Sequence, residues 1–199
     1  MLLDIVILPP PKLRREIGKS IKTAIGSYPY VFLVDNKKLI PHLSLWHINT
    51  SRDRISDIGK ELKRIVNNQK PVKINFIDAR SQRNHKNRLD LITKQDIDLV
   101  RLRQKVFRKI YPYKIGAMPP FDGKWSTEKI NQVQKYGKPI RFHPHVTIGW
   151  LKYEKHSPEV VKRIKRAKLN FLANEIYICN INKRWQVTKI IRKIEFAQK

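Results

Sequence analysis

The sequence predicts an α+β protein with two similar lobes that share one cleft. Stretches with helical periodicity alternate with short apolar runs that are typical of strands. A five-residue motif that begins at Pro41 has a near copy that begins at Pro144, and similar elements follow each copy. No flexible linker separates the two pseudo-duplicated parts. We therefore expect one bilobal domain over residues 1–199, with an inserted loop at residues 111–141.

The N-terminal half alternates strands and amphipathic helices. Residues 2–8 form an apolar run that predicts a strand, and Pro11 is then well placed at the start of a helix. Aliphatic residues recur every four positions to about residue 25, which supports this helix. Ser51 or Asp53 can cap a second helix. We expect further strands at residues 30–34 and about 42–48, and a hairpin from residues 72–79 and 88–93.

The C-terminal half repeats this order after a long connection. Gln95 or Asp96 can open a helix, and Ser157 opens another that extends to about Lys168. Residues 111–141 are rich in proline, glycine and aromatic residues and predict an ordered loop, with one or two helical turns near residues 127–134. Such a long loop in a compact domain is usually functional. We expect the remaining strands around His145 and at residues 170–178 and 185–196.

Composition limits the class of protein. An apolar fraction of 41% in 199 residues is enough for a hydrophobic core. The single cysteine, Cys179, favours an intracellular, cytoplasmic setting, and its apolar surroundings indicate a core residue rather than a nucleophile. No stretch approaches the roughly 20 apolar residues of a membrane span. The apolar N-terminus is interrupted by Asp4 and lacks the features of a signal peptide.

Positive charge dominates the chain. Lys and Arg number 43 against 16 Asp and Glu, which gives a formal net charge of +27. Such an excess causes self-repulsion unless a polyanion offsets it, and nucleic acid is the obvious partner. An anionic membrane surface fits less well, because no basic amphipathic helix carries bulky exposed aromatic residues. Solubility alone does not call for so large an excess.

Each of the two motifs carries one imidazole and one hydroxyl. They read Pro41-His42-Leu43-Ser44-Leu45 and Pro144-His145-Val146-Thr147-Ile148. In a strand, residues two apart face the same side, so each histidine should point with its hydroxyl while the aliphatic residues enter a core. The alternative is a pair of buried strands that each happen to carry a histidine.

Paired histidines suit acid–base catalysis near neutral pH, because one can take a proton while the other gives one. Neighbouring hydroxyls can donate hydrogen bonds to oxygens that gain negative charge. A phosphodiester suits this arrangement, since its non-bridging oxygens can accept from the hydroxyls.

The paired motifs resemble the two-histidine (2H) phosphoesterase superfamily, especially its LigT-like RNA 2′,3′-cyclic phosphodiesterases, also called 2′-5′ RNA ligases. The N-terminal run that ends in Pro9-Pro10-Pro11 and the segment from Phe142 to Ile148 are also similar to this family. The resemblance implies a bilobal α+β fold in which each lobe is an antiparallel sheet flanked by helices around a central cleft. Only the two motifs are specific to the family.

The resemblance also implies an activity without metal or cofactor, the opening of a terminal 2′,3′-cyclic phosphate of RNA to a 2′-phosphate. His42 and His145 would be the catalytic pair, with His145 as base and His42 as acid. Ser44 and Thr147 would bind the phosphate. Reverse 2′-5′ ligation would use the same chemistry. The alternatives are a 3′-end RNA exonuclease of the same superfamily and a non-catalytic RNA-binding protein.

Other residues are candidates for RNA contact. His143 lies two residues before His145, and Trp46 should share a face with His42 and Ser44, whereas His47 should face away. Aromatic and basic residues interleave in the long loop, which suits base stacking. His143-Pro144-His145 could also be read as a metal pair, but no acidic or cysteine cluster accompanies it, so we expect no metal site. The candidate RNA contacts are His143, Trp46, Trp125, Lys138 and Arg141.

Overall fold

The computed structural model describes residues 1–82, 86–116, 118, 142–164 and 169–197. The strands in these ranges are β1 (Leu2–Ile7), β2 (Tyr30–Leu33), β3 (Leu43–Asn49), β4 (Val72–Ser81), β5 (Arg88–Thr93), β6 (His145–Leu151), β7 (Asn170–Ala173), β8 (Glu175–Ile181) and β9 (Val187–Glu195). The helices are α1 (Pro11–Ile25), α2 (Ile55–Asn67), α3 (Ile97–Ile110) and α5 (Ser157–Arg163), with short 3-10 turns at Tyr111–Tyr113 and Glu154–His156.

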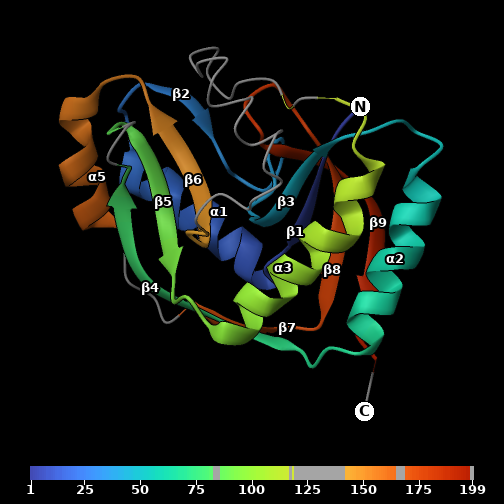
Figure 1. Ribbon diagram of the computed structural model, residues 1–199. Coiled ribbons are helices and arrows are strands. Elements are labelled where there is room, and N and C mark those ends of the chain that lie inside the picture. The colour runs from blue at the N-terminus through green and yellow to red at the C-terminus, as the bar shows by residue number, and fades with distance from the viewer. Residues whose placement is uncertain (83–85, 117, 119–141, 165–168, 198–199) are drawn as a thin grey trace.

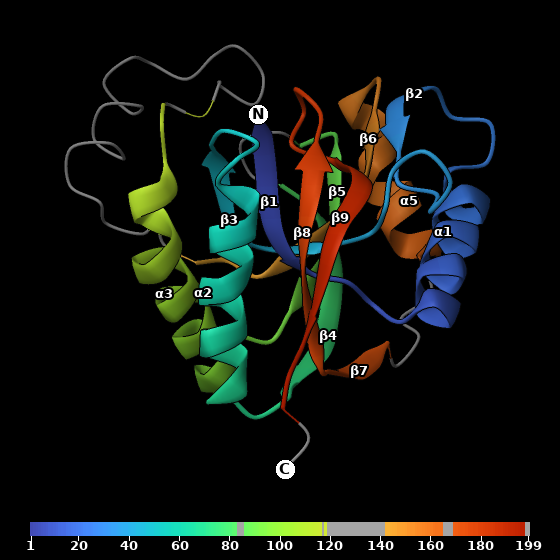
Figure 2. The same ribbon diagram turned by 90° about the vertical axis from the view of Figure 1, so that its right-hand side faces the viewer.

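The strands form one antiparallel sheet with the order β7-β4-β5-β6-β3-β1-β8-β9, and β2 pairs with β6 outside this path. The motif strands β3 and β6 are neighbours at its centre, where Leu43 lies opposite Val146. Helices α2 and α3 pack against the half that contains β3, and α1 and α5 pack against the half that contains β6 (Figures 1 and 2). This arrangement confirms the predicted α+β fold of antiparallel strands flanked by helices, although the strands form one continuous sheet and not a separate sheet in each lobe.

The two halves are not the two sequential units that the motif repeat suggests. The hairpin β4–β5 follows the first motif in the chain, yet β5 pairs with β6, the second motif strand. The hairpin β8–β9 follows the second motif, yet β8 pairs with β1, which lies beside β3. Since β3 already has β1 and β6 as neighbours, no edge of β3 remains for the hairpin that follows it.

The single strand predicted at residues 170–178 is wrong, because this segment forms two strands, β7 and β8, that are separated by Asn174. β7 pairs with β4 at one end of the sheet. β8 lies between β1 and β9 near the other end. Only one residue separates β7 from β8, so the two ends of the strand order must lie close together. The sheet is therefore curled, as Figure 1 shows.

The helix starts were predicted with mixed success. Pro11 begins α1, and the Asp96 carboxylate accepts a hydrogen bond from the Asp98 backbone N–H at the start of α3, as expected. The cap predicted for α2 is wrong, because this helix follows Arg54 and no side chain caps it. Helix α5 ends at Arg163, earlier than predicted. The helical turns predicted near residues 127–134 lie outside the described residues.

The core fills the space between the sheet and its helices. Leu43 and Leu45 of the first motif and Val146 and Ile148 of the second are buried there, as the motif pattern predicted. No helix in the described ranges has the length and apolar character that crossing a membrane requires.

Candidate active site

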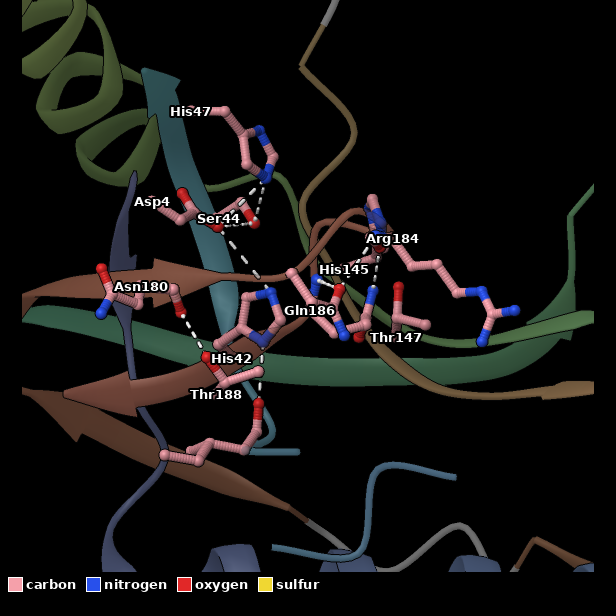
Figure 3. Close-up of polar contacts among 12 residues, drawn as sticks. Asp4, His42, Ser44, His47, His145, Thr147, Asn180, Arg184, Gln186 and Thr188 are labelled. Atoms are coloured by element: carbon pink, nitrogen blue, oxygen red, sulfur yellow. Dashed lines mark hydrogen bonds and ion pairs between the residues drawn. The ribbon is translucent and has the colours of Figure 1, made fainter. Parts of the chain in front are cut away.

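His42 stands directly before β3 and is almost fully buried, with 4% exposed. Its Nδ1 lies 2.8 Å from the Ile40 carbonyl oxygen, and because a carbonyl can only accept, Nδ1 carries a hydrogen. Nε2 is thereby turned toward Asp4, whose Oδ2 lies 3.8 Å away (Figure 3). Burial lowers the pKa of His42, and the negative charge of Asp4 offsets part of this shift.

Asp4 is a buried carboxylate on β1 that connects the polar groups of the first motif. It has no exposed surface, and its Oδ2 accepts a 2.6 Å hydrogen bond from Ser44 Oγ. His47 Nε2 lies 3.1 Å from the same oxygen. Ser44 therefore directs its only hydroxyl hydrogen at Asp4.

The predicted orientations of Trp46 and His47 are wrong. The pairing of β1 with β3 shifts where Val6 meets Ser44 and Ile5 meets Trp46, so Leu45 is an extra residue in a β-bulge. Beyond this bulge the alternation of faces is reversed, and His47 reaches Asp4. Trp46 instead packs edge-on against Phe107 of α3, with ring centroids 4.5 Å apart. Trp46 therefore lies on the α3 side of the sheet and not beside His42 and Ser44.

The second motif is organised around Arg88 of β5. One Arg88 nitrogen lies 2.9 Å from His145 Nε2 and donates a 2.7 Å hydrogen bond to Thr147 Oγ1. Since Arg88 can only donate, this contact requires an unprotonated Nε2. His145 Nδ1 lies 2.7 Å from the His143 carbonyl, so it carries the hydrogen, as in the first motif.

Asp90 is the carboxylate of the second motif. It is buried on β5, opposite Thr147 of β6. One of its oxygens lies 3.4 Å from Arg88 Nε, and the other accepts a 2.6 Å hydrogen bond from Gln82. His145 Nε2 lies 4.0 Å from Asp90 Oδ2. Each motif thus has a histidine fixed by a carbonyl two residues earlier and a buried carboxylate on the neighbouring strand.

The two motifs face the same side of the sheet. Leu43 and Val146 lie opposite each other on adjacent strands and both enter the core. The residues on either side of them must therefore point to the opposite face together. His145 is near enough that, when it is protonated, its charge lowers the pKa of His42. The structure thus brings together the four residues His42, Ser44, His145 and Thr147.

The remaining candidates are placed differently. The side chain of His143 is exposed, and its carbonyl orients His145. Trp125, Lys138 and Arg141 lie outside the described residues. Within the described ranges, no group of three or more histidine, cysteine or acidic side chains is arranged to hold a metal ion. Sequence reasoning missed Asp4, Arg88 and Asp90; the available signal was a lone carboxylate within an apolar strand at Asp4 and at Asp90.

Comparison with solved structures finds several chains with a similar fold. A structure described as a phosphoesterase has a TM-score of 0.59 and 15% identity, with 99% of each chain covered. More particularly, the fold is that of LigT: Escherichia coli LigT complexed with 3′-AMP has a TM-score of 0.63 and 12% identity, with 98% of each chain covered. The protein TT0787 of Thermus thermophilus gives a TM-score of 0.63 and 13% identity, also over 98% of each chain. No family model and no curated protein matches the sequence.

Proposed function

We propose that this protein is a metal-independent RNA 2′,3′-cyclic phosphodiesterase that opens a terminal cyclic phosphate to a 2′-phosphate. The observation that carries the proposal is the pair of histidines on one face of the sheet, each fixed through Nδ1 and each followed by a hydroxyl. The net charge of +27 favours a polyanionic substrate. Escherichia coli LigT, which shares the fold, has been solved with 3′-AMP, a nucleotide with phosphate on its ribose.

The contacts of the two histidines favour His145 as base and His42 as acid. Arg88 faces His145 Nε2 and fits the unprotonated ring, which can take a proton from water. Asp4 faces His42 Nε2 and favours the protonated ring, which can give a proton to a leaving oxygen. Burial works against that protonation and makes His42 a stronger acid.

The reaction then balances as a single displacement at phosphorus. The water oxygen forms a bond to phosphorus as His145 takes its proton, and the bond from phosphorus to O3′ breaks. His42 gives its proton to O3′, which becomes the 3′ hydroxyl, and the phosphate stays on O2′. Thr147 and Arg88 are placed to stabilise the charge on the non-bridging oxygens. A 5′ hydroxyl in place of water would give a 2′-5′ linkage by the same steps.

Incubation with a short RNA that ends in a 2′,3′-cyclic phosphate, in the presence of EDTA, tests the proposal. We expect a single product with a 2′-phosphate and a 3′ hydroxyl. His42→Ala and His145→Ala should each lower kcat by at least about 10²-fold, because each removes one acid–base group. His156→Ala, at a histidine that stacks on Tyr28 outside the two motifs, is the matched control and should retain activity.

Three other outcomes of this experiment would contradict the proposal. RNA shortened from its 3′ end would replace the proposal with an exonuclease. Tight, salt-sensitive RNA binding without turnover, unchanged in both variants, would indicate a binding protein on the same fold. Activity lost in EDTA and restored by a divalent cation would refute the metal-independent mechanism.

A further inference from the structure

The proposed chemistry leaves unused one histidine of β3, His47, which lies two residues after the first motif. His47 Nε2 lies 3.1 Å from Asp4 Oδ2 and 3.4 Å from Ser44 Oγ, and 23% of the His47 side chain is exposed. The second oxygen of Asp4 is buried and makes no hydrogen bond in the described part of the chain. A fully buried carboxylate is costly unless a proton donor or a cation faces it, and His47 is the nearest donor from a titratable ring.

The His47 ring also lies beside Trp185, which is in a strained turn. Trp185, between β8 and β9, has a φ of +56°, a conformation that a bulky side chain rarely adopts. The Asn182 carboxamide oxygen accepts from the backbone N–H groups of Arg184 and Gln186 and fixes the turn. The Trp185 ring lies 4.8 Å from the His47 ring. Backbone strain of this kind persists where the surroundings enforce it, often at a functional site.

The two motifs differ in the group that accompanies the buried carboxylate. In the second motif Arg88 faces Asp90, and a guanidinium is always charged. Next to the first motif His47 faces Asp4, and an imidazole is charged only when both of its nitrogens carry hydrogen. The buried carboxylate of β1 therefore has an imidazole as its partner where that of β5 has a guanidinium.

We propose that His47 and Asp4 form a positioning pair that orients Ser44 and sets the protonation of His42. The proposal rests on the function proposed above. Asp4 raises the pKa of His42 through its negative charge, while His47 and His145 lower it when they are protonated. Other charged or titratable groups around the pair, among the described residues, include Cys179 on β8, whose pKa the charge of Asp4 raises, and Arg14 of α1, whose charge lowers the pKa of the same thiol. Arg103 of α3 lies on the opposite face beside Trp46.

The proposal predicts opposite effects for the two members of the pair. His47→Gln keeps a hydrogen-bonding side chain but removes the charge, so the pKa of His42 should rise. Asp4→Asn keeps the shape and removes the negative charge, so the pKa of His42 should fall. If His42 is the acid, the alkaline limb of the kcat profile moves to higher pH in His47→Gln and to lower pH in Asp4→Asn. His47→Lys, which retains a positive charge, should not move that limb upward.

An NMR titration of the imidazoles tests the pair independently of catalysis. Protein labelled at histidine is titrated as wild type, His47→Gln, His47→Lys and Asp4→Asn, with His156→Gln as the matched control and circular dichroism as the check on folding. We expect the His42 midpoint to move up in His47→Gln and to keep its value in His156→Gln. If Asp4→Asn does not fold, the pair of His47 variants still decides.

An unchanged His42 midpoint in His47→Gln, or the same midpoint in His47→Gln and His47→Lys, would overturn the proposal. Wild-type protein that fails to open cyclic-phosphate RNA while its His42 midpoint responds as predicted would refute the proposed function and leave the pair intact. The two failures are thereby distinguishable.

Discussion

Ser44 and Thr147 occupy equivalent positions in the two motifs but use their hydroxyl groups differently. Ser44 donates its hydrogen to Asp4, whereas Thr147 accepts from Arg88. Among the described contacts, the hydroxyl hydrogen of Thr147 is thus the one available to a phosphate oxygen. We therefore expect Thr147 to contribute more than Ser44 to binding the phosphate.

Replacement of each hydroxyl tests this difference. Thr147→Val should lower kcat by about 10²-fold, because it removes a donor to the oxygens that gain charge. Ser44→Ala should lower kcat less. Single-turnover rates on cyclic-phosphate RNA measure both effects, with Thr188→Val, an exposed threonine on β9, as control. Equal losses in the two variants would contradict the distinction.

Cys179 should be inert in the folded protein. The thiol is fully buried, and burial together with the nearby charge of Asp4 raises its pKa. We expect no reaction with an aromatic disulfide reagent at neutral pH, and one equivalent of reaction after denaturation in urea. Fast labelling of the folded protein would show that β8 opens readily.

At the residue scale the sequence predicted the four motif residues and missed their partners. His42, Ser44, His145 and Thr147 could be found because residues two apart in one strand share a face. Asp4, Arg88 and Asp90 come from β1 and β5, which reach the motif strands only through pairing between segments far apart in the sequence.

At the scale of elements, the bulge in β3 decides which side chains reach the site. An extra residue at Leu45 brings His47 to Asp4 and turns Trp46 to α3. The sequence from Leu43 to Ile48 does not indicate the bulge, since aliphatic residues are buried whether or not Leu45 is an extra residue. The division between β7 and β8 falls at the polar pair Asn174-Glu175, which separates two apolar runs and was the available signal for two strands.

The contact between β3 and β6 should be important for stability, because it joins the two halves of the sheet through Leu43 and Val146. Leu43 is 1% exposed, so Leu43→Ala should lower the free energy of unfolding by about 2–5 kcal/mol. Urea unfolding measures this loss. Leu172→Ala, at a leucine that is 59% exposed, should change it by less than about 0.5 kcal/mol. Similar values for the two variants would mean that this contact is not a packed junction.

At the scale of the whole molecule, the net charge and the catalytic residues act on different steps, substrate capture and the chemical step. The two motifs perform the proposed chemistry, while the net charge of +27 acts on any polyanion through long-range attraction. Composition alone was sufficient to predict this second property, because it does not depend on where the strands lie.

Added salt should therefore weaken substrate capture and leave the chemical step unchanged. For a cyclic-phosphate RNA of several nucleotides, KM should rise steeply with salt, with a slope of about 0.7 per phosphate contacted on a logarithmic plot. kcat should stay nearly constant. A 2′,3′-cyclic mononucleotide, with a single phosphate, should show little change in KM. An equal salt response for both substrates would mean that the basic surface does not contact the RNA chain.

The interleaving of the two halves also constrains the order in which the protein can fold during synthesis. A ribosome makes β1 first, yet one neighbour of β1 is β8, which begins only at residue 175. Until then one edge of β1 stays without its partner, and the half that contains His42 is incomplete. The long separation between these strands favours slow folding. Assembly of the first motif therefore waits until β8 has been synthesised, and until then the unpaired edge of β1 is open to pairing with other chains.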